Sequence, residues 1–280
     1  MHPRGGSELE NFRSPAEIAA LAVESGVAKA KLSIGKMLVL GFLAGAFIAL
    51  GFLFDLRVTA TIPKAWGDGF RFLIGGAVFP VGLMLVVIAG AELLTGNMMT
   101  LPIAFHARRV RLGAVIKNWI FVTIGNFFGS IFISYMAIEA HLLTTGDWKK
   151  WTIGVAVAKV SLPYWSTIIS AIGCNWLVTL AVWLALGAKD VIGKIFGIWF
   201  PIFAFVAIGF QHVVANMFII PTAIWLGGPI TWGQAITELS GAFIGNAIGG
   251  WLFVASAYAY TYINKTASQS EGKTGTISST

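Results

Sequence analysis

The sequence predicts an all-α integral membrane protein with six transmembrane helices, built as two inverted three-helix repeats whose second and fifth helices are broken. Composition is the first observation: 57% of the 280 residues are hydrophobic, 11% are charged and the mean hydropathy is +0.81. Soluble domains carry about 25% charged residues. The second observation is a set of long apolar stretches, and the third is a signature that occurs twice, 119 residues apart.

Six apolar stretches are long enough to cross a bilayer, which takes about 20 residues. They cover residues 35–54, 70–106, 114–138, 164–187, 192–226 and 235–263. The second and fifth are too long, because a straight helix of about 33 residues would extend about 50 Å. Their glycines favour breaks at Gly90–Gly96 and near Gly209–Ala215.

The repeated signature lies at these two expected breaks. It reads Gly90-Ala-Glu92-Leu-Leu-Thr95-Gly-Asn97-Met in the first half and Gly209-Phe-Gln211-His212-Val-Val-Ala-Asn216-Met in the second. A second pair, Gly125-Asn126-x-x-Gly129 and Gly245-Asn246-x-x-Gly249, recurs at an offset of 120. Three spans in each half give the halves opposite orientations. Paired, glycine-interrupted hydrophobic segments are the sequence feature that best indicates a transport site.

The chain divides into a cytoplasmic N-terminal segment (1–34), a pore domain (35–263) and a disordered cytoplasmic tail (264–280). Ser14-Pro15-Ala16-Glu17 forms a capping box that predicts a short amphipathic helix along the cytoplasmic surface. Thirteen of the 19 lysines and arginines fall on the side of the two termini. Basic residues concentrate in cytoplasmic loops, so we expect both termini in the cytoplasm and the protein in the plasma (cell inner) membrane.

Several function classes lack their sequence features. There is no phosphate-binding loop, zinc-ligand cluster or serine-hydrolase motif. We therefore expect no enzymatic activity, no metal and no cofactor. The net charge of +7 is accounted for by basic loops and does not require nucleic acid. Cys174 is the only cysteine, and a lone thiol in a membrane helix is ordinarily inert packing.

His212 is the leading candidate for a functional group, because it is the only histidine expected inside the membrane. Ionisable groups at that depth are functional candidates by default, and an imidazole with an ordinary pKa of about 6.5 can exchange protons reversibly. Thr95 could donate a hydrogen bond to an anion or to His212 across the pore. Lys159, at the end of a polar loop, would attract anions.

Structural roles are expected for other polar residues of the two signatures. Glu92 reads as the sole acid deep in a span, accepting hydrogen bonds from loop amides or from a neighbouring subunit. Asn97 and Asn216 are expected to bond backbone groups freed at the breaks, which hydrocarbon cannot solvate. Gly90 and Gly209 allow the breaks themselves.

The two signatures closely resemble those of the formate/nitrite transporter family, over all six spans. The resemblance implies six tilted helices per protomer, an aquaporin-like protomer with its own pore, and assembly into homopentamers. It assigns Lys159 and Asn175, sixteen residues later, to the pore. It also assigns two apolar constrictions to Phe79, Leu83, Leu93, Leu94 and Phe205. Gln211 is a departure, since the family usually has glutamate before the central histidine.

We expect a channel or transporter for small monovalent anions of weak acids within a lipid membrane. Formate is the first choice, and nitrite, hydrosulfide, acetate and lactate are alternatives. In this hypothesis Lys159 gathers the anion, His212 supplies a proton directly or through water, and the neutral acid crosses the apolar constrictions. The competing version has the anion crossing while bonded to a protonated His212. A neutral-solute pore lacks its Asn-Pro-Ala repeats here, and an intramembrane enzyme would need a second catalytic group near His212.

Overall fold

The computed structural model describes residues 12–263, so the expected disordered tail at 264–280 lies outside the described residues. The described part is almost entirely helical. Six helical segments in it are long and apolar enough to cross a membrane, which confirms the predicted class of fold. These candidate spans are Ile34–Thr59, Asp68–Gly90, Leu112–Glu139, Tyr164–Gly187, Val191–Ile208 and Trp232–Ile263.

The first half of the described chain runs from the amphipathic helix to the third span. Its helices are α1 (Pro15–Ala30), α2 (Ile34–Thr59), α3 (Asp68–Val78), α4 (Val81–Met84), the π-helical segment η2 (Leu85–Gly90), α5 (Leu94–His106) and α6 (Leu112–Glu139), with a short 3-10 turn, η1 (Lys64–Trp66), before α3. The second predicted span is therefore two helical stretches, α3 to η2 and then α5.

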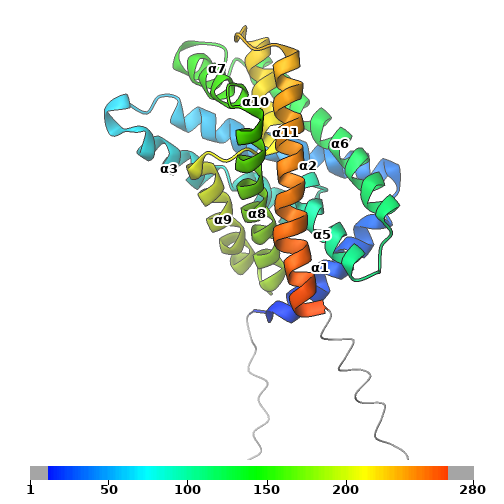
Figure 1. The fold of residues 1–280 in the computed structure, drawn as a ribbon. Coiled ribbons are helices and arrows are strands. Elements are labelled where there is room, and N and C mark those ends of the chain that lie inside the picture. The colour runs from blue at the N-terminus through cyan, green and yellow to red at the C-terminus, as the bar shows by residue number, and fades with distance from the viewer. Residues whose placement is uncertain (1–11, 264–280) are drawn as a thin grey trace, which may run out of the picture.

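The second half repeats this order. Its helices are α7 (Gly146–Val160), α8 (Tyr164–Gly187), α9 (Val191–Ile208), α10 (Val213–Trp225) and α11 (Trp232–Gly250), with π-helical continuations η3 (Trp251–Ser256) and η4 (Ala259–Ile263). α1 lies at the end of the molecule where the described chain begins and ends, and α7 lies at the opposite end (Figure 1). The halves are thus inverted relative to one another.

Both predicted breaks are present, and a glycine lies at each one. Gly90 has φ 91° and Gly209 has φ 87°, values that L-residues with a side chain rarely adopt. The helical stretch ends at Gly90 and resumes at Leu94 in the first half; it ends at Ile208 and resumes at Val213 in the second. The breaks bring non-helical backbone to the centre of the protein.

Each half is held together by one long helix pair, α2 against α6 in the first half and α8 against α11 in the second. The repeated glycines allow close approach. A Cβ atom added at Gly129 would overlap the carbonyl oxygen of Phe42 in α2, and one added at Gly245 would overlap that of Ile168 in α8. The repeated Gly-Asn motifs therefore lie where two backbones touch.

The predicted capping box begins α1. The Ser14 hydroxyl accepts from the backbone N–H of Glu17 at 3.4 Å, and the Glu17 carboxylate accepts from the backbone N–H of Ser14 at 2.7 Å. The Ser14 backbone and hydroxyl donors hold the pKa of Glu17 below its usual value. Ile18 and Ala22 are buried where α1 packs against α5 and α8.

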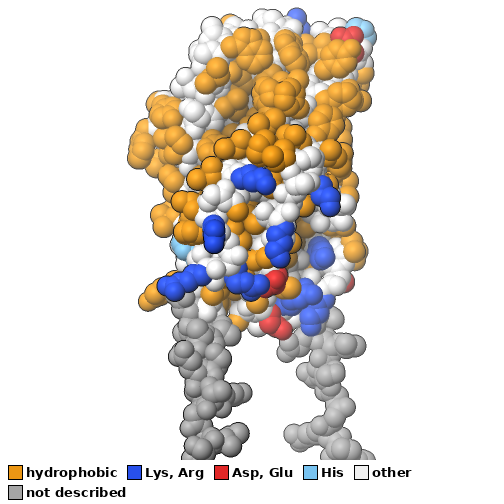
Figure 2. Space-filling model, turned by 90° about the vertical axis from the view of Figure 1, so that its right-hand side faces the viewer, with side chains coloured by type: hydrophobic (Ala, Val, Ile, Leu, Met, Phe, Trp, Pro, Cys, Tyr) orange, Lys and Arg blue, Asp and Glu red, His pale blue; other side chains and the backbone are white. Residues whose placement is uncertain are grey.

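Charge is distributed unevenly along the long axis of the molecule. On the face shown in Figure 2, lysine and arginine side chains gather at the end where the termini leave, and hydrophobic side chains cover the opposite half. That distribution matches the sequence count used above to orient the chain.

Candidate functional site

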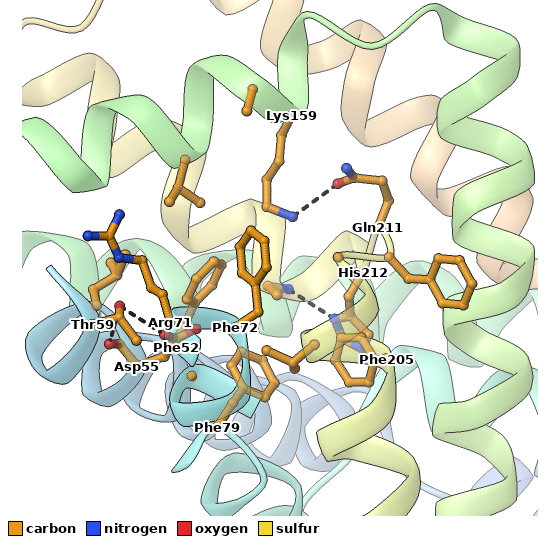
Figure 3. A pocket seen from close by; sticks show the side chains of 18 of the residues that line it. Phe52, Asp55, Thr59, Arg71, Phe72, Phe79, Lys159, Phe205, Gln211 and His212 are labelled. Carbon is orange, nitrogen blue, oxygen red and sulfur yellow. Dashed lines mark hydrogen bonds between the residues drawn. The ribbon is translucent and has the colours of Figure 1, made fainter. Parts of the chain in front are cut away.

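A cavity of about 380 Å³ lies between the α7 end of the molecule and the broken centre. Its wall carries the side chains of Lys159, Gln211 and His212 on one side and the aromatic rings of Phe79 and Phe205 at its floor (Figure 3). These residues come from α7, the break before α10, the end of α3, and α9. The cavity is mostly apolar, with a small number of polar groups, as is usual for binding sites of small solutes.

His212 is at the N-cap of α10, and both ring nitrogens have partners. Its Nδ1 accepts a hydrogen bond from the backbone N–H of Ala215 at 3.0 Å. Its Nε2 lies 3.0 Å from the hydroxyl oxygen of Thr95. Because Nδ1 accepts, the neutral ring carries its proton on Nε2 and donates it to Thr95. The two residues therefore meet across the halves, but the histidine donates and Thr95 accepts, the reverse of the direction expected from the sequence.

The N-termini of two half-helices converge on this point. Thr95 lies in the first turn of α5, and His212 precedes the first turn of α10. The N-terminus of a helix carries a partial positive charge of about half an elementary charge. The convergence favours an anion at the centre of the protein. It disfavours protonation of the imidazole, because the imidazolium would add a positive charge beside the partial positive charges of the two helix N-termini.

Two phenylalanines close the floor of the cavity. The rings of Phe79 and Phe205 meet edge to face with centroids 5.6 Å apart. Phe205 also stacks on the His212 ring at 5.7 Å. The other three residues of the expected constrictions are buried in the hydrophobic core and do not line this cavity: Leu83, Leu93 and Leu94.

Lys159 extends from the end of α7 into the cavity. Its Nζ donates to Oε1 of Gln211 at 3.0 Å and lies 5.9 Å from the centre of the Phe52 ring. Burial lowers the pKa of Lys159, and the acidic groups nearby, with Glu238 the strongest, counter this effect. With an amide at Gln211, no carboxylate of residues 12–263 is in direct contact with the Lys159 ammonium group.

Asn175 is brought to the same centre but does not line the cavity. It is fully buried, and its amide donates to the backbone carbonyls of Thr95 at 3.2 Å and Asn246 at 2.7 Å. Its geometry is that of a residue that holds the α5 break against α8 and α11. Contact with a solute in this cavity would need a rearrangement.

The backbone N–H and C=O groups at the two helix breaks form hydrogen bonds with residues other than those expected. Asn126 accepts from the backbone N–H of Leu94 and donates to the carbonyl of Glu92; Asn246 does the same for Val213 and Gln211. The expectation that Asn97 and Asn216 bond freed backbone was therefore wrong. Their amide nitrogens bond side chains instead, because they lie one turn inside α5 and α10, where the backbone is already helical.

Glu92 also differs from expectation. Its carboxylate accepts from Nζ of Lys29 at 2.6 Å and from the amide of Asn97 at 2.8 Å, rather than from loop amides. The partner is thus a lysine of α1 in the same chain. Glu92 itself follows the candidate span that ends at Gly90, whereas Asp55 in α2 and Glu238 in α11 lie inside candidate spans, each within seven residues of a span end.

Sequence reasoning missed three charged residues near the cavity. Asp55 lines it and accepts from the Thr59 hydroxyl; Arg71 lines it with its guanidinium 4.2 Å above the Trp151 ring. Glu238 is 4% exposed and accepts from the amide of Asn216 at 2.6 Å. The sequence repeat could have pointed to Glu238, because Glu238 stands 120 residues after Asn118, which is the offset of the repeated Gly-Asn motif.

Within residues 12–263 no group of three or more histidine, cysteine and acidic side chains is placed to hold a metal ion. The described chain is thus a membrane protein with broken helices, converging helix N-termini and a cavity that leads to an apolar closure. Those features define a channel or transporter.

Comparison with known proteins identifies the kind of transporter. The model of the formate/nitrite transporter family matches residues 16–260. The chain is 55% identical over 263 residues to an uncharacterized transporter, YrhG, of Bacillus subtilis, a match that covers 94% of this chain and 98% of that protein. It is 51% identical to the formate channel BtFdhC of Bacillus thuringiensis, over 90% and 96% of the two chains. The chain belongs to the formate/nitrite transporter family.

Solved structures agree. An ion channel of this family superposes with a TM-score of 0.80 at 28% identity, covering 88% of this chain and 98% of the other. A pentameric formate channel with formate bound superposes with a TM-score of 0.71 at 26% identity, covering 82% and 98%. The relatives are channels and transporters rather than enzymes, as the sequence predicted.

Proposed function

We propose that the chain carries formate across the plasma membrane together with a proton, through a pore that passes His212. The observation that carries the proposal is the cavity in which Lys159, Gln211 and His212 lie above the closure formed by Phe79 and Phe205. Formate is favoured because two relatives carry it in their names, the formate channel of Bacillus thuringiensis and the pentameric formate channel.

The apolar closure favours transport of the anion together with a proton. Moving a carboxylate-sized ion into a low-dielectric medium costs about 20 kcal/mol in the idealised limit and several kcal/mol after relaxation. Protonating a weak acid three pH units above its pKa costs only about 4 kcal/mol. Formate that takes up a proton in the cavity therefore crosses the closure as formic acid with the lower barrier, and dissociates again on the far side.

The hydrogen bonds of His212 favour one of its two possible roles. A neutral imidazole can give up its Nε2 proton only if Nδ1 gains one, and Nδ1 is occupied by the N–H of Ala215. The converging helix N-termini add a further cost to an imidazolium. We therefore assign to His212 the role of a hydrogen-bond donor whose Nε2–H passes from the Thr95 hydroxyl to the passing solute, and the proton comes from water in the cavity.

Orientation and assembly follow from the same proposal. Basic residues lie mainly on the side of the termini, which supports a cytoplasmic α1 and a Lys159 cavity on the extracellular side. The pentameric relative supports five protomers, each with its own pore and surrounded by lipid.

Flux into proteoliposomes tests the proposal. Purified protein is reconstituted, and uptake of radiolabelled formate, nitrite, hydrosulfide and lactate is measured at acidic and neutral external pH, with internal pH recorded by a trapped dye. We expect formate uptake that is faster at acidic external pH and acidifies the lumen. Uptake of another anion in place of formate would show that formate is not the substrate and that the other anion is. Swelling in neutral solutes without anion preference would exclude the proposed mechanism.

A further inference from the structure

Two polar clusters occupy equivalent places in the two halves of the chain. The inner cluster consists of Lys29, Glu92, Asn97 and Asn118, and the outer cluster consists of Lys159, Gln211, Asn216 and Glu238. In both, a lysine from the helix that precedes the half's first span bonds the residue at the break. In both, an asparagine one turn later joins that residue to a side chain of the half's last span.

The hydrogen bonds correspond one for one. In the inner cluster, Lys29 donates to Glu92 at 2.6 Å, and the Asn97 amide donates to Glu92 and Asn118, both at 2.8 Å. In the outer cluster, Lys159 donates to Gln211 at 3.0 Å. The Asn216 amide donates to Gln211 at 3.0 Å and to Glu238 at 2.6 Å.

What differs is the position of the carboxylate. The inner cluster has its acid at the break, Glu92, in direct contact with the lysine, and an amide at Asn118. The outer cluster has an amide at the break, Gln211, and its acid at Glu238. Relative to the inner cluster, the outer cluster has exchanged the positions of its acid and its amide. Each cluster keeps one cation and one carboxylate, so this exchange conserves the charge balance that buried ions need.

Glu238 is placed to act on Lys159 through this chain of bonds. It is 4% exposed, and its Oε2 has no hydrogen-bond partner among the described residues. It borders a separate cavity of about 290 Å³ that Val160 and Tyr164 also line. Other charged or titratable groups facing Lys159 are Asp55, Cys174 and His212, and Arg71 lines the same cavity. Glu238 contributes the strongest electrostatic interaction with Lys159 among the acidic groups.

We propose that Glu238 is a positioning residue for transport, whose carboxylate supplies through Asn216 and Gln211 the counter-charge of Lys159. A carboxylate at the break would pair with the lysine directly and compete with an anionic solute for it. A carboxylate three hydrogen bonds away keeps the lysine protonated and leaves its charge facing the cavity. The exchange thus makes the outer lysine an anion attractor, whereas the inner lysine is neutralised in place by Glu92.

This inference rests on the proposed anion transport, and three variants test it: Glu238→Gln, Gln211→Glu, and the two combined. Glu238→Gln is nearly isosteric and removes the counter-charge. We expect its KM for formate to rise roughly tenfold, with a larger rise at alkaline pH, and its thermal unfolding temperature to fall. Gln211→Glu alone places two carboxylates around one lysine, and we expect it to raise KM as well.

The double variant separates the effect of losing a carboxylate near Lys159 from the effect of altering the side chain at position 238. In the double variant a carboxylate again pairs with Lys159, in the arrangement of the inner cluster, so the unfolding temperature should return toward that of the wild type. Its KM should stay high, because the direct pair competes with formate. Asn118→Asp serves as the matched control, since it alters the equivalent site of the inner cluster and should leave external KM unchanged.

Failure of this inference differs from failure of the proposed function. If the wild type takes up no formate, the substrate is wrong, and the same variants are compared by unfolding temperature and with the anion that is carried. If the wild type takes up formate but Glu238→Gln keeps the wild-type KM, pH profile and unfolding temperature, Glu238 is not the counter-charge. A destabilised Glu238→Gln that Gln211→Glu fails to rescue would equally overturn the proposal.

Discussion

The hydroxyl oxygen of Thr95 lies 3.0 Å from Nε2 of His212, although 117 residues separate them in the chain. The contact joins the first turn of α5 to the N-cap of α10, one from each half of the inverted repeat. Because Nδ1 of His212 accepts from Ala215, Nε2 is the protonated nitrogen of the neutral ring. The pair therefore presents an N–H donor and a hydroxyl at the place where the two halves meet.

Substitution His212→Asn tests whether this histidine donates a hydrogen bond or a proton. An asparagine amide can still donate but cannot titrate, so we expect formate uptake to fall about tenfold while its dependence on external pH is kept. The measurement is initial uptake into proteoliposomes at acidic and neutral external pH. His106→Asn is the matched control, because His106 bonds Ser256 and Trp251 away from the cavity. Uptake that no longer responds to pH would identify His212 as the proton source.

Thr95→Val should impair both stability and transport. Valine has the shape of threonine but accepts no hydrogen bond, so the Nε2–H of His212 is left buried without a partner. Such a loss costs about 1–3 kcal/mol in free energy of unfolding. Thr95→Ser restores the hydroxyl and should recover most of both quantities. Thr100→Val is the control, since Thr100 is equally buried but bonds only within its own helix; equal effects at the two positions would argue against a special role for Thr95.

Opening the closure should convert coupled transport into leakage. Phe79→Ala removes a ring that meets Phe205 edge to face, and water that fills the gap would solvate a charged anion. We expect an anion current in planar bilayers or voltage-clamped cells, together with a weaker dependence of formate uptake on external pH. Phe128→Ala, at an exposed position of α6, is the control. A variant that stays electrically silent and fully pH-dependent would show that these rings do not form the barrier.

The pKa of Lys159 sets the upper pH limit of anion attraction. Burial lowers this pKa below the value of an ordinary lysine, and nearby acids only partly counter the shift. The positive charge is present below the folded-state pKa and is lost as pH rises through it. Wild-type KM for formate should therefore rise at alkaline external pH, before an exposed lysine would titrate. Lys159→Arg keeps its charge throughout and should flatten that rise, whereas Lys159→Met should show a high KM at every pH; identical profiles for all three would exclude the role.

The sequence predicted those parts of the site that depend on the chain's own pattern. The breaks at Gly90 and Gly209 were predictable because positive φ selects glycine and because the same signature occurs twice. Thr95 and His212 were both predictable as site residues because each lies in one copy of that signature, although at the offset of 119 His212 corresponds to Leu93 rather than to Thr95. Side-chain partners were not predictable in this way. Hydrophobic patterning does not indicate which face of α2 meets the cavity or which face of α11 meets Asn216, so neither Asp55 nor Glu238 was singled out from the sequence.

Three glycine-to-alanine substitutions separate backbone conformation from packing. At Gly209 an added Cβ meets no atom within 4 Å, but φ is 87°, so the cost is backbone strain of about 1–2 kcal/mol. At Gly245 an added Cβ would overlap the Ile168 carbonyl and approach Cβ of Ala171 to 2.6 Å. Overpacking of this kind costs about 1–3 kcal/mol, and we expect the upper end, because the obstacle is backbone and cannot rotate away.

Gly113 in α6 is the matched control, since its added Cβ also meets no atom within 4 Å and its backbone is ordinary helix. Gly113→Ala should stabilise the protein by about 0.5–1 kcal/mol. Unfolding temperatures of the three purified variants should therefore rank Gly113→Ala first, Gly209→Ala second and Gly245→Ala last. Formate uptake should discriminate further, because strain at Gly209 displaces His212, three residues along the chain, whereas Gly245→Ala separates α8 from α11. A Gly209→Ala variant with full stability and full uptake would mean that the left-handed turn does not position the histidine.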